Sequence, residues 1–334
     1  MELDRTTINL KSFILKLSVL FILLLIVSIF AIQFGSVTIS FSEILSLLSN
    51  SESSNTANEI IFNIRIPRLL LAIGVGGGLS VAGAVFQALL MNPLADPYIL
   101  GVSSGGSFGA VLAMLLGLSF FFVQIFSIFG ALFVIGLVFF IGHRFGRLEP
   151  NTLLLTGVMI GAFFSASILL MLTFLNHTLR TAIFWLVGNL AMADNFSAYY
   201  VVVFSMLISI ILSLFGYKLN LLAMGDEDST NLGLNTKTVK SIIYLFASVL
   251  VGFIVSVSGI IGFIGLLIPH VVRMIFGTDN RIVVPASFLI GAIFLILADT
   301  IARIIILPSE LPVGVVTAMI GAPTFIYLLK KQSN

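Results

Sequence analysis

Three histidines are the first residues to consider for chemistry, because imidazole groups bind metals and carry protons near neutral pH. His143, His177 and His270 fall on segments that we expect inside, outside and within a membrane, so they cannot meet at one metal ion. The chain has no cysteine, which removes disulfides, thiolate metal sites and cysteine nucleophiles. It also lacks an HExxH zinc motif and a GxxxxGK(S/T) phosphate loop. We therefore predict no enzyme activity, no metal, no cofactor and no ATP hydrolysis by the P-loop route.

Two arginines around a proline offer electrostatic rather than catalytic chemistry. Arg65 and Arg68 are three residues apart at the start of an apolar segment, so their side chains project together. Cations are disfavoured at a helix N-terminus, and basic residues are less common on the outer side of a membrane, where we place this end. Two interpretations are open. The pair anchors to lipid phosphates, or it docks an acidic patch of an external protein, with Arg303 as a third cation.

Asp299 is the main ionisable residue that falls inside a predicted membrane helix. It precedes Arg303 by four residues, so the two share a helix face near the outer end and should form an ion pair. Carriers driven by protons or sodium bury ionisable groups in their path, and the other helix interiors here are almost free of charge. A transporter without such groups and without an ATP site needs an external motor, which favours a partner subunit. An ion-coupled secondary transporter that uses Asp299 is the competing hypothesis.

The elements that must position these residues are membrane helices. The chain is 59% hydrophobic and 9% charged, with a mean hydropathy of +1.20, whereas soluble domains are about one quarter charged. Apolar runs long enough for a ~30 Å hydrocarbon core recur along the whole length. We predict an all-α integral membrane protein with a single transmembrane domain over residues 1–334. About ten helices are expected, over 12–34, 62–91, 102–116, 122–144, 151–175, 197–216, 238–258, 268–277, 281–305 and 313–331.

The third and eighth of these segments look too short to span alone. An even number of spans places both termini on one side, and the basic residues test that arrangement. With the N-terminus inside, twelve of the sixteen Lys and Arg residues, including every Lys, lie in cytoplasmic segments. Such a bias is typical of inner membrane proteins, so we predict a multi-pass protein with both termini cytoplasmic.

The stretch from 65 to 109 is rich in small residues and is broken at Asn92-Pro93 and Asp96-Pro97. Broken helices at membrane depth are tolerated only where protein or a water-filled path surrounds them, so we predict that this stretch forms the wall of a transport pathway. Within it, the segment Ser80–Gly83 is followed by Pro93. A similar segment, Ser256–Gly259 followed by Pro269, occurs 176 residues later at the same spacing. The two copies run in opposite directions, which predicts an inverted internal repeat. A chance match of four residues is the alternative.

Three loops complete the organisation. The segment 217–237, hereafter the coupling segment, carries apolar residues around a Gly225-Asp226 turn and predicts two short helices that dock on a cytoplasmic partner. A solvated charged loop is the alternative. The segment 176–196 contains the single tryptophan, Trp185, and predicts an interfacial helix at the outer surface. The polar segment 35–61 is predicted to be an outer loop.

Several segments together resemble one transporter family. They are RIPR (65–68), SVAGAVFQALLMNPLADPYILG (80–101), LAMGDEDSTNLG (222–233), SGIIGFIGLLIPHVVR (258–273), LADTIAR (297–303) and ELPVGVVTAMIGAPTFIYLL (310–329). In this order they resemble the permease subunits of type II ABC importers, which take up iron–siderophore complexes, haem and vitamin B12. The resemblance covers most of the chain.

The resemblance implies a homodimer of ten-helix subunits in the cytoplasmic membrane of a prokaryote, with the pathway at the dimer axis. An extracytoplasmic substrate-binding protein would pair its acidic residues with Arg65, Arg68 and Arg303. Two ATP-binding cassette subunits, which would bind ATP and Mg, would dock on the coupling segment. Membrane lipid is the remaining partner, and no nucleic acid is expected. The residues implied in ATPase coupling are Leu222, Gly225, Asp226, Glu227, Leu232 and Gly233.

The resemblance also implies a gate at Asn92 and Leu94 and a second constriction at Asn151 and Thr152. Pro150-Asn151 stands where the vitamin B12 permease has Ser and Thr, so the second constriction departs from that pattern. The helix from 153 to 175 would line the path. The implied mechanism is ATP-driven alternating access for an iron–siderophore or similar chelate, with a vitamin B12 or haem permease as the alternative. Whether the partner permease is identical or related, and how the binding protein is anchored, are left open.

Overall fold

The fold is a bundle of α-helices. The computed structural model describes residues 10–35, 39, 55–144, 147–191, 195–307 and 309–332. Within these residues, seven helices are long and apolar enough to cross a membrane, and three further apolar helices are shorter. The predicted all-α membrane class is therefore confirmed. The small antiparallel hairpin of β1 (His143–Arg144) and β2 (Arg147–Leu148) was not predicted.

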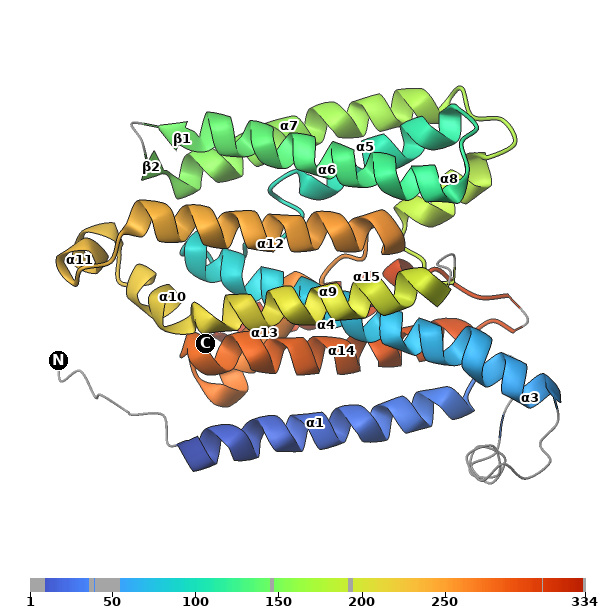
Figure 1. The fold of residues 1–334 in the computed structure, drawn as a ribbon, viewed down its shortest axis with the longest axis horizontal. Coiled ribbons are helices and arrows are strands. Elements are labelled where there is room, and N and C mark those ends of the chain that lie inside the picture. Colours follow the sequence, from blue (N-terminus) through green and yellow to red (C-terminus); the bar gives the residue numbers. More distant parts are fainter. Residues whose placement is uncertain are drawn as a thin grey trace.

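Eight of the ten predicted segments differ from the observed helices by at most three residues at either end. Figure 1 shows the elements in order. They are α1 (Leu10–Gln33), α3 (Asn55–Ile60), the π-helix η1 (Ile61–Arg65), α4 (Ile66–Leu89), α5 (Val102–Leu115), α6 (Phe120–Gly142), α7 (Pro150–Leu172), α8 (Leu179–Leu186), α9 (Asn195–Leu214), α10 (Gly216–Leu222), α11 (Asp226–Asn231), α12 (Thr236–Ser258), α13 (Ile264–Phe276), α14 (Asn280–Ile304) and α15 (Val313–Gln332).

The two larger differences both involve a proline. Helix is already present at Asn55, so the predicted outer loop is too long at its end, and its residues 36–38 and 40–54 lie outside the described part. The π-helical turn η1 ends at Arg65, two residues before Pro67, which cannot donate a backbone hydrogen bond. At the other site, the predicted start at 268 is wrong because α13 begins at Ile264 and continues through Pro269.

A side chain from a distant helix makes this continuation possible. Pro269 lacks the N–H that would bond the carbonyl of Gly265, four residues earlier. Gln87 on α4 replaces it, because its Nε2 donates to Gly265 O at 3.4 Å and to Leu266 O at 3.2 Å. Neighbouring helices commonly satisfy the groups that a proline frees in a membrane helix.

The helix α4 is the centre of the bundle, with 83% of its most apolar window buried. It packs against α9, α12, α13 and α14. Its glycines allow close contact, since a Cβ on Gly76 would lie 2.4 Å from Gly291 O and one on Gly83 would lie 1.9 Å from Gly265 O. Because helices of the same chain cover α4, the prediction that it forms a pathway wall is wrong; its small residues serve packing.

The inverted repeat is visible in the packing of the helices. Figure 1 shows α4 and α12 running in opposite directions, and each packs on the short helix of the other half, α4 on α13 and α12 on α5. The register inferred from the four-residue match is wrong. Ser80 and Gly83 lie within α4, whereas Ser256 belongs to the last turn of α12 and Gly259 caps it with φ 68°.

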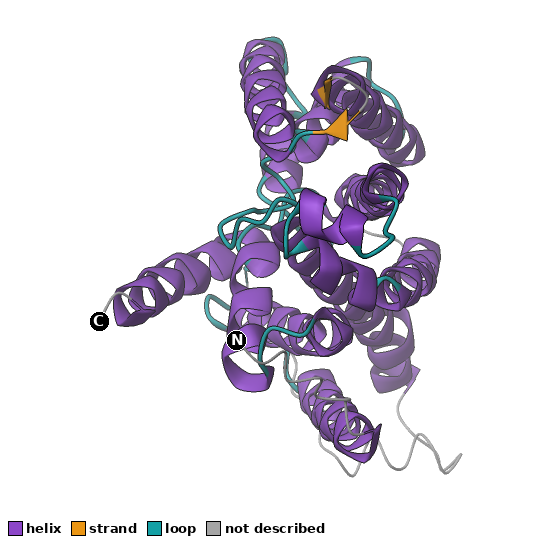
Figure 2. Cartoon of the chain, turned by 90° about the vertical axis from the view of Figure 1, so that its left-hand side faces the viewer, coloured by secondary structure: helices purple, strands orange, loops and turns teal. Residues whose placement is uncertain are grey.

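The two ends of the bundle carry different elements. One end, hereafter the α11 end, has α10, α11 and the β hairpin, together with the start of α1 and the end of α15 (Figure 1). The other, the α3 end, has α3 and α8 (Figure 1). Viewed from the α11 end, α15 projects away from the other helices (Figure 2). Several of its side chains are correspondingly exposed, including Met319 at 71% and Ile326 at 67%.

The helix predicted within 176–196 is present as α8, but its tryptophan does not lie at the surface. Trp185 is 1% exposed, and its backbone carbonyl touches the position where Gly259 would carry a Cβ. The predicted interfacial role of Trp185 is therefore wrong. The short helix instead lies against α5, and its Trp185 carbonyl meets Gly259, the C-cap of α12.

Candidate functional site at the two ends of the bundle

The α3 end holds a group of charged residues that we call the arginine cluster: Arg65, Arg68, Asp299, Arg303 and Glu310. Arg68 Nε donates to Asp299 Oδ1 at 2.9 Å and to Oδ2 at 3.1 Å. Its Nη1 donates to Glu310 Oε2 at 2.6 Å. Arg303 Nε lies 3.1 Å from Asp299 Oδ2, which confirms the predicted pair four residues apart on α14. Asp299 thus joins α14 to α4 through the guanidinium of Arg68, while Arg303 pairs with it from the next turn of α14.

The other atoms of Arg65 and Arg303 bind the end of α1. Arg65 Nη1 donates to Ile32 O and to Gln33 O, the latter at 3.1 Å. Arg303 donates from Nη1 to Phe34 O at 3.0 Å and from Nη2 to Ala31 O at 3.3 Å. Carbonyls at the end of a helix have no partner in the helix and carry partial negative charge. The unfavourable place of Arg65 in the sequence is explained, because it acts at the C-terminus of α1, whereas Arg68 is explained by its carboxylate partners.

Glu310 is the most exposed side chain of the cluster. Arg65, Arg68 and Arg303 are 5%, 8% and 8% exposed, whereas the side chain of Glu310 is 37% exposed. A cavity of about 250 Å³ is lined by all three arginines and Glu310. The cluster has three positive and two negative groups, and its accessible carboxylate is Glu310, which the sequence analysis did not select. External docking at this cluster stays a prediction.

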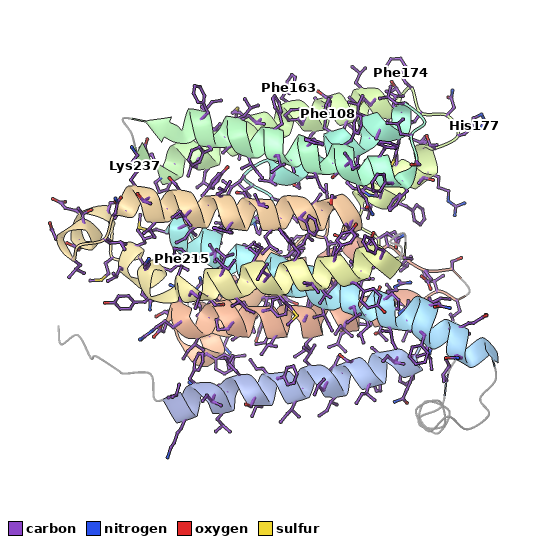
Figure 3. The ribbon with its side chains drawn as sticks, in the orientation of Figure 1. Phe108, Phe163, Phe174, His177, Phe215 and Lys237 are labelled. Atoms are coloured by element: carbon purple, nitrogen blue, oxygen red, sulfur yellow. The ribbon has the colours of Figure 1, made fainter. Side chains whose placement is uncertain are left out.

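The coupling segment lies at the α11 end, between Phe215 and Lys237 (Figure 3). It forms α10 and α11 separated by Gly225, whose φ of +103° favours glycine. The two predicted short helices are thus present. Leu219 and Leu222, expected to contact a partner, are 0% and 1% exposed.

These two leucines therefore pack within the chain, and the apolar part of the prediction is wrong for them. The large side chains with apolar surface that this segment exposes are Met224 and Leu232, at 47% and 60%, and the ring of Tyr217, at 58%. Glu227 is exposed and Asp226 is half-buried. Gly233 also has a positive φ, 84°. Two bonds hold α11 in place. Ser229 Oγ donates to Leu221 O at 2.7 Å, and Lys240 Nζ on α12 lies 2.5 Å from Asp226 Oδ1.

The residues implied as gates lie on two separate segments near the α11 end. Asn92 Oδ1 accepts a hydrogen bond from Leu94 N at 2.9 Å, which forms a local turn after α4. Leu94 is 48% exposed. Asn151 is exposed in the first turn of α7, and Thr152 Oγ1 donates to Glu149 Oε2 at 2.7 Å. These polar groups are accessible, and their role as gates stays a prediction.

The connection between α4 and α5 is fixed by one tyrosine. Tyr98 OH donates to Ile261 O at 3.0 Å and accepts from Ile261 N at 3.1 Å, so it ties this connection to the one before α13. Asp96 Oδ1 accepts from Tyr98 N at 2.8 Å. Burial raises the pKa of Asp96 to about 6, although this backbone hydrogen bond acts in the opposite direction.

The helix α7 presents an apolar face at the edge of the bundle. Only 22% of its most apolar window is buried. Figure 3 shows Phe163 and Phe174 at this edge, away from the central helices, and they are 67% and 65% exposed. Small residues are interspersed on the exposed side, including Ala162 and Ser165. Such a surface is available to lipid, to a second subunit or to a pathway.

Comparison with known proteins places these features in one family. The model of the FecCD transport family matches residues 23–331. The chain is 37% identical to the hemin transport system permease HmuU of Yersinia pestis, over 95% of this chain and 96% of that protein. It is 35% identical to the Fe(3+)-citrate import system permease YfmE of Bacillus subtilis, over 99% of both chains. A solved metal-chelate type ABC transporter in an inward-facing conformation superposes with a TM-score of 0.85 and 32% identity, over 94% of this chain and 98% of that chain.

Proposed function

The chain belongs to the FecCD transport family and is a multi-pass membrane permease of an ABC importer, and from this premise we propose that it carries an iron–siderophore or similar metal chelate into a prokaryotic cell. The observation that carries the proposal is the match to a metal-chelate type transporter over nearly the whole chain. Haem and vitamin B12 are the alternative substrates, because one similar permease is named for hemin and another for cobalamin. The chain supplies the path, while a separate subunit hydrolyses ATP.

Two ATPase subunits dock on the coupling segment in this proposal, which places the α11 end and both termini in the cytoplasm. The support is the surface that α10 and α11 expose: Met224 and Leu232 as apolar contacts beside the acidic Glu227. Replacing Gly225, Asp226 and Glu227 together with alanine should release the ATPase from the purified complex. Retention of the ATPase with normal transport would disprove this docking site.

The substrate-binding protein docks at the arginine cluster on the outer side. Because the arginines are buried, the accessible Glu310 gives the sharper test. Glu310→Gln would leave Arg68 with one carboxylate instead of two and raise the positive potential of the cavity. An acidic partner should then bind more tightly, and binding should weaken as salt is added. Unchanged affinity for the binding protein would reject this site.

Two copies of the chain form the pathway between them, and the exposed faces of α7 and α15 are the surfaces that fit this arrangement. ATP binding by the docked subunits would move the coupling segment and open the segments around Asn92 and Asn151 in alternation. Ion coupling through Asp299 is disfavoured, because both of its carboxylate oxygens contact guanidinium groups.

The direct test is uptake by proteoliposomes that contain the permease, its ATPase and its binding protein. Uptake of a labelled ferric siderophore should require ATP and exceed uptake of haem and cobalamin. Preferred uptake of haem or cobalamin would change the substrate. Uptake by the permease alone, driven by a proton or sodium gradient, would overturn the ABC mechanism.

A further inference from the structure

The contact between α10 and the start of α14 is the tightest connection of the coupling segment to a membrane helix. Gly216 opens α10 against the backbone of Arg281, where an added Cβ would lie 2.8 Å from Arg281 Cα. A side chain at Gly216 would therefore push α10 away from α14. Because the two backbones are in such close contact, α10 and α14 cannot shift relative to each other without a steric clash.

One asparagine uses its whole amide group in this contact. Asn220 Oδ1 accepts from Asn280 N at 2.8 Å and from Asn280 Nδ2 at 2.9 Å. Asn220 Nδ2 donates to Asp279 Oδ1 at 2.7 Å. Asn280 is 5% exposed, so water does not readily replace these bonds.

Asp279 is in turn held in place by its own helix. It is the N-cap of α14 and accepts from Arg281 N at 2.9 Å. The side chain of Arg281 binds the same carboxylate through Nε at 3.0 Å and Nη2 at 2.6 Å. Burial alone would raise the pKa of Asp279, but the hydrogen bonds from Arg281 and Asn220 lower it. The acceptor for Asn220 is thus an oriented, ionised carboxylate.

The other short helix is attached less firmly. The link of α11 to α12 is the ion pair between Asp226 and Lys240, in which the Asp226 side chain is 36% exposed. The two paired atoms, Lys240 Nζ and Asp226 Oδ1, are buried, but this link is a single ion pair between side chains, whereas α10 meets α14 through its backbone at Gly216 and through three amide hydrogen bonds. Besides its direct continuation into α12, the coupling segment therefore has a rigid contact through which a displacement should pass to α14.

The helix α14 reaches across the bundle from this contact to the arginine cluster. It begins at Asn280 and ends at Ile304, and it includes Asp299 and Arg303. On the way, Gly291 touches Gly76 of the central helix α4. One continuous helix thus connects the surface proposed for the ATPase with the cluster proposed for the binding protein.

We propose that Asn220, with Asp279 and Asn280 as its partners, is the positioning residue that makes α10 and α14 one rigid unit, so that α14 carries the movement of the coupling segment across the membrane. This inference rests on the proposed function, since it requires that the ATPase docks on the coupling segment. It assigns the transmission of force to one helix and to three named side chains.

The first test is Asn220→Ala in the complete complex of permease, ATPase and binding protein. The ATPase should still copurify and hydrolyse ATP at its basal rate. Stimulation of hydrolysis by the loaded binding protein, and transport per ATP, should each fall about five- to tenfold. Ser241→Ala is the matched control, because this exposed hydroxyl near the same end bonds only its own helix carbonyl, and it should change neither quantity.

The second test replaces the hydrogen bonds by a covalent link. The natural chain has no cysteine, so Asn220→Cys with Asn280→Cys creates the only reactive pair and leaves Asp279 in place. Before linking, this variant should be uncoupled like Asn220→Ala. A short bis-methanethiosulfonate reagent should restore stimulated hydrolysis and transport, and a reductant should abolish them again. A merely structural role of Asn220 would not produce this reversible rescue.

The outcomes separate the two proposals. If the ATPase fails to bind the unmodified permease, the proposed function is wrong. If the ATPase binds and Asn220→Ala couples normally, or if the linked variant stays uncoupled, the rigid unit of α10 and α14 is wrong. Size-exclusion profiles identify any variant that has not folded, and that variant is excluded. The reversible cross-link in the folded cysteine variant then tests the proposal by itself.

Discussion

The two ends of the bundle use charge in opposite ways. At the α3 end, three arginines are buried. Their positive charges are balanced by the carboxylates of Asp299 and Glu310 and by carbonyls at the end of α1. At the α11 end, the acidic residues of the coupling segment are largely exposed, and a buried amide contact provides the attachment. At one end the charged groups are paired in a buried network, whereas at the other Asp226 is paired with Lys240 and Glu227 is exposed. The difference predicts that the α3 end is rigid and that the α11 end offers charge at its surface.

The sharpest way to break this comparison is Asp299→Ala. Removing this carboxylate leaves Arg68 and Arg303 buried with one partner fewer each, which should destabilise the protein by about 3–5 kcal/mol. Thermal unfolding in detergent measures the loss. Glu310→Ala is the control, because its exposed side chain can be replaced by water, and it should cost less than about 1 kcal/mol. Equal losses in the free energy of unfolding for the two variants would contradict the conclusion that Asp299 holds the buried arginine cluster together.

Arg65→Leu tests the capping of α1. The change leaves the carbonyls of Ile32 and Gln33 without this donor, which should cost about 1–3 kcal/mol. Because the lost bonds belong to one helix end, hydrogen exchange should speed up first in the last turn of α1. Unchanged exchange in that turn, with a loss of stability elsewhere, would show that Arg65 acts through packing instead.

Asp96→Asn tests an acid that belongs to neither end's charged group and lies between α4 and α5. Its pKa is raised from 3.8 to about 6, so the folded state holds a proton that the unfolded state has already lost. Stability should therefore fall as the pH rises from about 4 to about 6 and stay level above that. Asparagine keeps the acceptor for Tyr98 N and should stabilise the protein at pH 7.5 by about 1–3 kcal/mol. An unchanged pH profile would assign the titration to another group.

Lys240→Met should have the smallest effect. The ammonium group and the Asp226 oxygen that it contacts are both buried, but the Asp226 side chain is 36% exposed overall, so the freed carboxylate can turn to water and the loss should be about 1 kcal/mol. Unfolding measurements beside Asp299→Ala then compare an ion pair from each end. A loss as large as that of Asp299→Ala would show that the charged groups at the α11 end are also paired in a buried network.

Local signals predicted much of this structure. Apolar length placed the membrane helices, Gly225 separated the two short helices, and the four-residue spacing of Asp299 and Arg303 predicted their ion pair. Each of these features depends on neighbours in the sequence, through helix periodicity or turn geometry. The family resemblance added the order of the segments, which no single pattern supplies.

Contacts between distant residues account for what the sequence did not predict. The helix through Pro269 depends on Gln87, and Arg65 depends on carbonyls at the end of α1. Arg68, on the other side of Pro67, depends on carboxylates more than 200 residues away. Trp185 was expected at a membrane surface because the contact with Gly259 is invisible in one dimension. Glu310 could have been selected from its place in an outer loop beside the arginine-bearing segments, but its bond to Arg68 spans most of the chain.

The capping of α1 by Arg303 has a consequence for the order of assembly. Only 17% of the most apolar window of α1 is buried, and the carbonyl of Phe34 waits for a guanidinium that lies 269 residues further along the chain. At a synthesis rate of about 5–20 residues per second, that group leaves the ribosome roughly 15–50 s after α1. Arg65 can bind the carbonyls of Ile32 and Gln33 early, but the packing of α1 on α14 and the bond from Arg303 form only after α14 has been made. The first helix to enter the membrane therefore completes its contacts among the last, and α1 must remain stable in lipid while the rest of the bundle is made.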